Sequence, residues 1–196
     1  ELSRFLDCAQ TTHYKASLRV LRYLNRTSTK SLIFEPKPKP GKELVAYSDS
    51  SYNSDADTSR ARSGYICLFN GCPIMWRSRI QPIVTLSSTE AEYIALTDCL
   101  KEVLWLRQLL SEIDYPQDTT VIFCDNQGAI VIVENAMCKQ RTKHIRLRYH
   151  WIRDIVNDEE AKIVYICTND NVADLLTKNV GAPFIARPPA DKYYDA

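Results

Sequence analysis

The stretch LVAYSDSSYNSDADTSRARSGYICLFNGCPIMWRSRIQPIVTLSSTEAEYIALTDCL (residues 44–100) begins with short apolar segments and ends in a long helical pattern. The short segments are rich in β-branched and aromatic residues and are bounded by turn residues, which is typical of β-strands. They cover residues 44–51, 63–69, 74–79 and 82–86. Asn70-Gly71 separates the second segment from the third and favours a tight hairpin turn. We therefore expect a meander of three strands, with a further short strand before the helix.

Residues 88–112 form the clearest helical pattern. One face carries apolar residues at helical spacing, namely Ala91, Ile94, Ala95, Cys99, Leu100, Val103, Leu106 and Leu110. Ser87 and Glu90 have the spacing of a capping box, in which two side chains satisfy the first backbone N–H groups of a helix. The helix is therefore predicted to begin near Ser88, which leaves Glu92 to point elsewhere.

The second half of the sequence alternates between strand and helix patterns. The predicted strands cover residues 120–125 and 161–167, and the predicted helices follow Asn126 or cover residues 143–156 and 171–178. A meander followed by alternating β and α elements predicts the α/β class, with a mixed sheet flanked by helices.

The N-terminal region differs from the rest in its pattern. Residues 1–34 are first helical and then extended, and the segment FEPKPKPGKE (residues 34–43) alternates Pro with Lys. Such a segment interrupts a helix and favours solvated, extended backbone. We interpret residues 1–40 as a short helical appendage with a linker, residues 41–180 as the main domain and residues 181–196 as a disordered tail.

The composition restricts the classes of protein. The 196 residues include 25 Lys and Arg against 24 Asp and Glu, and 45% are hydrophobic. This is the composition of a globular chain, and a net charge of +1 means that any binding of nucleic acid depends on local patches. No run reaches the roughly 18 apolar residues of a membrane span. We expect no membrane partner and no small-molecule cofactor.

The seven cysteines include no CxxC pair, which argues against a disulfide framework and a structural zinc site. Those with apolar neighbours are expected to be small core residues in a reducing compartment; they are Cys67, Cys99, Cys124 and Cys167. Trp76 and Trp105 are also expected in the core.

Four carboxylates stand out by their position. They are Asp49 within an apolar strand, Glu92 near the start of the long helix, Asp125 at the end of an apolar strand and Asp174 at the start of the last helix. Strand ends and helix starts can converge at one edge of a sheet, where carboxylates bind hard cations such as Mg2+. Two ions about 4 Å apart would activate water and stabilise the leaving oxygen of a phosphodiester. The residues alone leave open the alternative that these side chains only cap turns and helix starts.

Five ordered motifs carry a resemblance to a known family. They are AYSDSSY (46–52), SRARSGYICLFNGCPIMWRSRIQPIVTLSSTEAEYIAL (59–96), VIFCDNQGAI (121–130), KHIRLRYHWIRD (143–154) and NVADLLTK (171–178). Over roughly residues 43–180 the sequence resembles the ribonuclease H domain of copia-type (Pseudoviridae-like) LTR retrotransposon polyproteins. Residues 1–34 look like the end of the preceding reverse transcriptase region, its thumb or connection.

The resemblance implies a ribonuclease H-like fold with a five-stranded mixed sheet, and it maps the four catalytic, metal-binding acids onto Asp49, Glu92, Asp125 and Asp174. It implies a metal-dependent endonuclease that uses two Mg2+ or Mn2+ ions to hydrolyse the RNA strand of RNA–DNA hybrids during reverse transcription. The implied partners are the hybrid and the reverse transcriptase polymerase domain of the same polyprotein. The implied location is the cytoplasm, in a virus-like particle, with the nucleus as the alternative.

One departure from the family concerns the segment before the last acid. Many ribonucleases H have a flexible His loop there, whereas CTNDNVAD (residues 167–174) has no His. Two other functions therefore stay open. One is a catalytically idle structural or interaction module, and the other is an integrase-type nuclease core. The integrase order places its Glu on a late helix, whereas Glu92 follows the meander and Asp174 comes last, which favours ribonuclease H.

Polar and basic residues near the acids are candidates for substrate binding. Ser50, Ser88, Thr89, Asn126 and Gln127 are close to the acids in sequence and could bond 2′-hydroxyls and phosphates in a minor groove. Lys143, Arg146 and Arg148 belong to a basic run that could neutralise hybrid phosphates. A solvated helix face is the alternative for the basic run.

Overall fold

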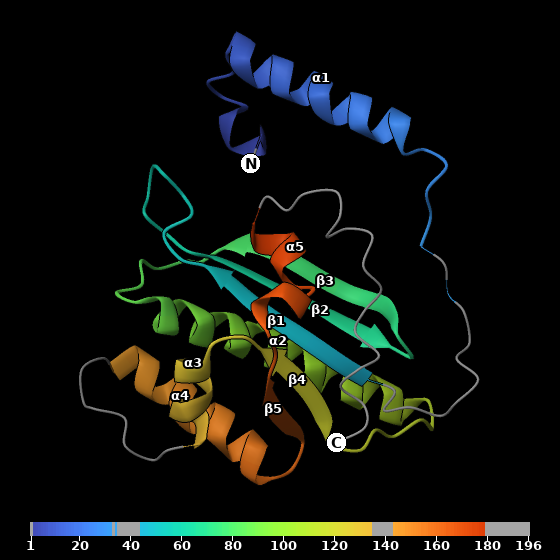
Figure 1. Cartoon of the computed structure of the whole chain (residues 1–196), viewed down its shortest axis with the longest axis vertical. Helices are drawn as coiled ribbons and strands as arrows, with labels where there is room; N and C mark the ends of the chain where they lie inside the picture. Colours follow the sequence, from blue (N-terminus) through green and yellow to red (C-terminus); the bar gives the residue numbers. More distant parts are fainter. Residues whose placement is uncertain (1, 33, 35–43, 135–142, 179–196) are drawn as a thin grey trace. The chain divides into compact units, whose positions relative to one another are not determined.

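A computed structural model describes residues 2–32, 34, 44–134 and 143–178 (Figure 1). The chain forms two compact units, Glu1–Phe34 and Glu35–Ala196. The first contains a short 3-10 helix, Leu2–Phe5, and the helix α1, Thr11–Arg26. The linker boundary near residue 41 and the tail 181–196 fall outside the described residues, so both stay predictions.

The second unit is built on one five-stranded sheet. Its strands are β1 (Leu44–Ser51), β2 (Arg62–Phe69), β3 (Cys72–Ile80), β4 (Thr120–Cys124) and β5 (Ala161–Tyr165). Their order across the sheet is β3-β2-β1-β4-β5. The hairpin-connected neighbours β1, β2 and β3 pair antiparallel, whereas β1, β4 and β5 pair parallel. The predicted mixed sheet is therefore confirmed.

The helices cover the two faces of the sheet unequally. The strand β1 alternates its side chains, so that Leu44 and Ala46 belong to one apolar core and Val45 and Tyr47 to the other. The first core is completed by α2 (Ser88–Glu112), α3 (Gln127–Glu134) and α4 (Lys143–Asn157). On the second face lies the short helix α5 (Asp174–Thr177), shown in red in Figure 1. In the described part of the chain, none of the helices has both the length and the apolar character of a membrane span.

The helix starts follow the sequence pattern closely. Ser87 Oγ accepts the backbone N–H of Glu90 at 3.1 Å, which confirms the predicted start of α2. The Glu90 carboxylate accepts the N–H of Leu86 at 2.8 Å, one residue earlier than in an ordinary capping box. At α3, Asn126 Oδ1 accepts the N–H of Ala129 at 2.9 Å, as expected of a cap.

The prediction of a strand over residues 82–86 is wrong, because this segment has bends and no regular secondary structure. Pro82 has no N–H to donate to a sheet. Immediately before it, the buried Gln81 donates through Nε2 to Ser63 Oγ and to the Ala91 carbonyl, both at 2.8 Å. Gln81 therefore draws the chain off the sheet and towards α2.

Three predictions of burial are also wrong. Trp76 on β3 and Trp105 on α2 are 53% and 50% exposed, and Cys167 is exposed as well. Apolar neighbours in the sequence do not by themselves bury a side chain. Its burial depends on whether another helix or strand packs over the face on which it lies.

Gly64 permits the close approach of α5 to the sheet. It pairs with Asp49 on β1 and with Ser78 on β3, in the middle of the sheet. A Cβ at Gly64 would lie 2.7 Å from Thr177 Cγ2 and 2.9 Å from Leu176 Cβ. The Ser78 hydroxyl donates to the Leu176 carbonyl at 2.5 Å and holds the helix in this place.

We expect Gly64→Ala to destabilise the protein by about 1–3 kcal/mol, because the added methyl group forces α5 away from the sheet. Adding Thr177→Ser removes the nearer of the two contacting atoms and should restore part of the loss. Urea unfolding of the single and double variants measures both effects. A Gly64→Ala variant as stable as wild type would show that α5 is not fixed by this contact.

Candidate metal centre

Two of the acids are brought together by parallel pairing of β1 with β4. The register sets Ser48 opposite Cys124, so the next residues, Asp49 and Asp125, are neighbours. Asp49 is still inside β1 and is fully buried, whereas Asp125 lies just beyond the end of β4 and is half-buried. Parallel strands place their carboxyl ends at the same edge of a sheet, which is why residues far apart in sequence meet here.

Glu92 comes to this edge from α2. The helix is fixed at its first turn by the Ser87 cap and by the bond from Gln81 to the Ala91 carbonyl, next to Glu92. The side chain of Glu92 is only 6% exposed. A carboxylate so deeply buried in the first turns of a helix is costly unless it has a partner.

Asp174 comes from the opposite face of the sheet, at the start of α5. The preceding Asn171 is fully buried; its Nδ2 donates to the Ser48 carbonyl at 3.0 Å and its Oδ1 accepts the N–H of Ala173 at 3.1 Å. Asn171 thus ties the start of α5 to β1. This anchored turn occupies the position where the family resemblance led us to look for a His loop.

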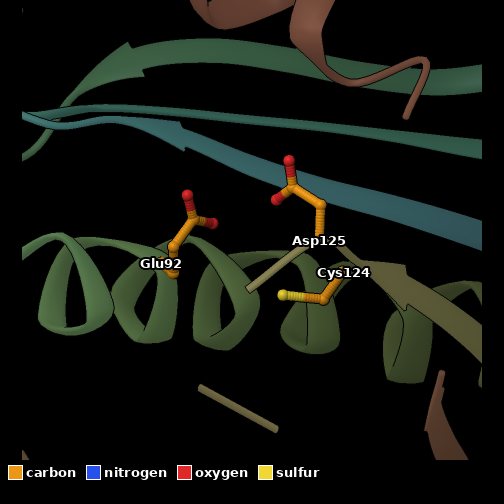
Figure 2. Close-up of side chains that lie close together, drawn as sticks. All are labelled: Glu92, Cys124 and Asp125. Carbon is orange, nitrogen blue, oxygen red and sulfur yellow. The ribbon is translucent and has the colours of Figure 1, made fainter. Parts of the chain in front are cut away.

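The four acids form two overlapping groups. Carboxylate oxygens of Asp49, Asp125 and Asp174 all lie within 4.8 Å of one another, and the same limit holds for Glu92, Cys124 Sγ and Asp125. Figure 2 shows the second group, with the carboxylates of Glu92 and Asp125 directed to the same side. Asp125 belongs to both groups, so the structure brings together all four predicted acids.

Thr177, the last residue of α5, and the following Lys178 partly compensate this negative charge. Lys178 Nζ lies 2.7 Å from Asp174 Oδ1 and 3.3 Å from Asp49 Oδ1. The Thr177 hydroxyl donates to Asp49 Oδ2 in a short hydrogen bond. Burial lowers the pKa of Lys178, but the contacts with Asp174 and Asp49 outweigh this effect and raise it overall.

Burial and the negative charge that remains uncompensated raise the pKa values of Asp49 and Glu92. Burial, together with the charges of Asp174 and Asp125, raises the pKa of Asp49 to about 7, although Thr177 and Lys178 oppose the rise. Burial and the charges of Asp49 and Asp125 raise the pKa of Glu92 to about 9. Both carboxyl groups are therefore harder to ionise than in water, and added positive charge favours their ionised forms.

The donor chemistry of the site fits hard divalent cations. In the described part of the chain, Glu92 Oε2 is buried without a hydrogen-bond partner. Such atoms cost about 1–3 kcal/mol each unless a ligand satisfies them. Carboxylate oxygens are the ligands that Mg2+ and Mn2+ prefer. Asp49, Glu92, Asp125 and Asp174 are therefore the residues that could hold such ions.

The predicted substrate-binding residues differ in their access to solvent. Ser50 is buried beside Glu92, Thr89 and Asn126 are partly exposed, and Ser88 and Gln127 are exposed. Asn126 already caps α3, so its Oδ1 is engaged. Arg148 lies on α4 and is partly exposed. The backbone of Lys143 and Arg146 is in α4, but their side chains are outside those that the structure describes.

Sequence reasoning missed several residues of the centre. Thr177 and Lys178 follow Asp174 by three and four positions, a spacing that places them on the same helical face and could have indicated them. Asn171, Gly64 and Cys124 gave no comparable signal, because their roles depend on segments distant in sequence.

Comparison with known proteins identifies relatives among retrotransposon polyproteins. The retrovirus-related Pol polyprotein from transposon TNT 1-94 of Nicotiana tabacum is 43% identical over 179 residues, which are 91% of this chain and 13% of the relative. That from transposon RE2 of Arabidopsis thaliana is 37% identical over 178 residues, 90% of this chain and 12% of the relative. Secreted RxLR effector protein 161 of Plasmopara viticola is 43% identical over 105 residues, 54% of this chain and 72% of the relative. No protein-family model matches.

Solved structures show the same fold. An LC11 ribonuclease H1 in complex with an RNA/DNA hybrid has a TM-score of 0.51 at 18% identity, and the match covers 68% of this chain and 93% of that one. The foamy viral protease-reverse transcriptase in complex with an RNA/DNA hybrid has a TM-score of 0.52 at 15% identity, covering 87% and 26%.

The fold is thus that of the ribonucleases H. The relatives of this chain by sequence include the Pol polyproteins of copia-type retrotransposons. The chain spans only 12–13% of the length of these polyproteins.

The raised pKa of Glu92 predicts a pH-dependent stability in the absence of divalent ions. An acid whose pKa is about 9 in the folded protein and 4.5 when unperturbed contributes most stability below pH 4.5 and loses it as the pH rises to about 9. We expect Glu92→Gln to be more stable than wild type at pH 8, by on the order of a few kcal/mol, and to flatten the pH dependence. Unfolding in chelator at several pH values measures this.

Glu90→Gln provides the matched control, since it makes the same chemical change two residues away. It should keep the wild-type pH dependence. Equal pH profiles for wild type and Glu92→Gln would mean that Glu92 is not held in an environment that disfavours its charge.

Proposed function

We propose that this chain is a metal-dependent endonuclease that hydrolyses the RNA strand of RNA–DNA hybrids during retrotransposon reverse transcription. The observation that carries the proposal is the convergence of four acids from β1, α2, β4 and α5 around one centre. Three of these side chains are at most 6% exposed, and Lys178 is the cation that approaches two of them. Such a concentration of buried negative charge suits added cations.

The proposed cofactors are two Mg2+ or Mn2+ ions, which when bound would activate a water molecule and stabilise the leaving oxygen. Asp49, Asp125 and Asp174 would hold one ion, and Glu92 with Asp125 would contribute to the other. Lys178 would keep the carboxylates of Asp49 and Asp174 close together and partly neutralised. Gln81 and Asn171 would fix the helices from which two of the acids project.

The proposed substrate is a hybrid that lies across the carboxyl edge of the parallel strands. Ser88, Thr89 and Gln127 are accessible beside the acids, so their hydroxyl and amide groups would bond 2′-hydroxyls, which separate RNA from DNA. The related ribonuclease H1 and foamy viral enzyme were both solved with RNA/DNA hybrids, which supports this choice of substrate. The polymerase domain of the same polyprotein is the proposed partner, in a cytoplasmic virus-like particle.

We expect the purified chain to cut the RNA of a labelled RNA–DNA hybrid with Mg2+ and to leave DNA duplex intact. Asp49→Asn and Asp125→Asn should each reduce cleavage to the background seen in EDTA, because each removes a charged ligand. Glu90→Gln should retain cleavage, since Glu90 serves the start of α2. Gel analysis of the products measures all three.

The same assay separates the alternative functions. An idle structural module would leave the hybrid intact at every Mg2+ concentration while keeping the fold. An integrase-type core would act on DNA duplex ends. Activity that survives EDTA would contradict the proposed metal dependence.

Arg148 on α4 tests the proposed contact with the hybrid backbone. If it neutralises a phosphate, Arg148→Ala should weaken binding to hybrid and reduce the slope of log affinity against log salt by about 0.7–0.9. Lys162→Ala on β5 removes the same charge from an exposed strand position and provides the control. Equal slopes for wild type and both variants would leave the basic run as a solvated helix face.

A further inference from the structure

The Cys124 thiol lies beside the acids, although free buried cysteines ordinarily act as small apolar residues. Cys124 is the last residue of β4 and is fully buried. Its Sγ and the carboxylate oxygens of Glu92 and Asp125 all lie within 4.8 Å of one another. In Figure 2 the sulfur is directed to the side of α2, from which Glu92 projects.

A second observation indicates that this group can take a ligand. Glu92 Oε2 is buried and has no hydrogen-bond partner among the described residues, and Glu92 as a whole is 6% exposed. Ser50 is equally buried and lies beside Glu92, because hydrogen bonds from its side chain and backbone lower the pKa of Glu92. A buried carboxylate oxygen without a partner is rare in a protein interior and calls for an explanation.

The combination of one sulfur with two carboxylates differs chemically from an all-carboxylate site. Mg2+ prefers oxygen ligands, whereas Zn2+ and similar cations accept sulfur at about 2.3 Å and carboxylate oxygen at about 2.0–2.2 Å. Three ligand atoms within 4.8 Å of one another are close to the spacing that bonds of this length to one ion require.

We propose that Glu92, Cys124 and Asp125 form a site for a thiophilic divalent cation of the Zn2+ type, distinct in ligand chemistry from the Mg2+ centre. On binding, the S–H bond of Cys124 breaks, a sulfur–metal bond forms and the proton leaves to solvent, with no change of oxidation state. Because two of the carboxylates are shared, such an ion excludes the hard ion that Glu92 and Asp125 would otherwise hold. The site thereby makes this chain sensitive to thiophilic metals.

Cobalt(II) is the probe, since it replaces Zn2+ and gives a sulfur-to-metal charge-transfer band only when a thiolate is a ligand. The full chain is titrated with Co2+ in a background that carries Cys8→Ser, Cys138→Ser and Cys167→Ser, which leaves fewer competing thiols. Cys124→Ala is compared with Cys99→Ala, which removes another fully buried thiol that is not part of the group.

We expect the band to saturate at one ion per chain, to disappear in Cys124→Ala and to persist in Cys99→Ala. Losing an outer partner of a metal ligand typically weakens binding about 10–100-fold, so losing Cys124 itself should weaken Co2+ binding by at least about tenfold. Mg2+ binding, measured by calorimetry, should be unchanged in Cys124→Ala, and excess Mg2+ should weaken Co2+ binding to wild type.

A band of undiminished strength in Cys124→Ala, or Co2+ binding to wild type without a band, would overturn the proposal. Circular dichroism checks the fold of each variant, and Cys124→Ser, which nearly keeps the size of the side chain, replaces Cys124→Ala should the latter fail to fold. The measurement requires no turnover. A chain that shows the band but cuts no hybrid therefore contradicts the proposed function and leaves this inference intact.

Discussion

The burial of the Asp49 carboxylate in the middle of the sheet is the constraint on which the rest of the site depends. A charge at this position is tolerated only if neighbouring groups satisfy it. Thr177 and Lys178 do so from α5, and α5 can reach them only because Gly64, opposite Asp49 on β2, has no side chain. The short helix, the glycine and the carboxylate therefore form one interdependent unit, and the contribution of each depends on the other two.

The other acids give this unit its chemistry. Asp125 is adjacent to Asp49 because β1 and β4 are parallel and in register, and Glu92 comes from a helix whose start is fixed by Ser87 and Gln81. Burial and mutual repulsion raise the pKa values of Asp49 and Glu92, so the negative charge of the centre exceeds what Lys178 compensates among the described residues. A bound cation relieves this repulsion, which strengthens its binding. Without bound cations, the folded protein becomes less stable as the pH rises.

Cys124 adds a softer ligand to a centre otherwise made of oxygen atoms. Cys124 is the last residue of β4, and alternation along the strand places it on the same face as Ile122, which packs in the core that α2 completes. Selectivity between metals then depends on which ligands an ion uses, not only on charge. The same geometry that concentrates the acids thus allows a second class of cation to compete for two of them.

The α/β class, the three-stranded meander and the bounds of α2 with its Ser87 cap follow from the sequence, because periodicity and capping residues are local. The family resemblance singled out the four acids that the fold brings together. Local patterns misplaced residues 82–86, Trp76, Trp105 and Cys167, since a strand needs a neighbour to pair with and a buried face needs a layer above it. Only the tertiary structure decided that Gln81 leaves the sheet, that Lys178 joins Asp49 to Asp174 and that Cys124 lies beside Glu92. Most of these contacts join residues that are distant in the sequence. They therefore form only when the sheet and its helices pack together.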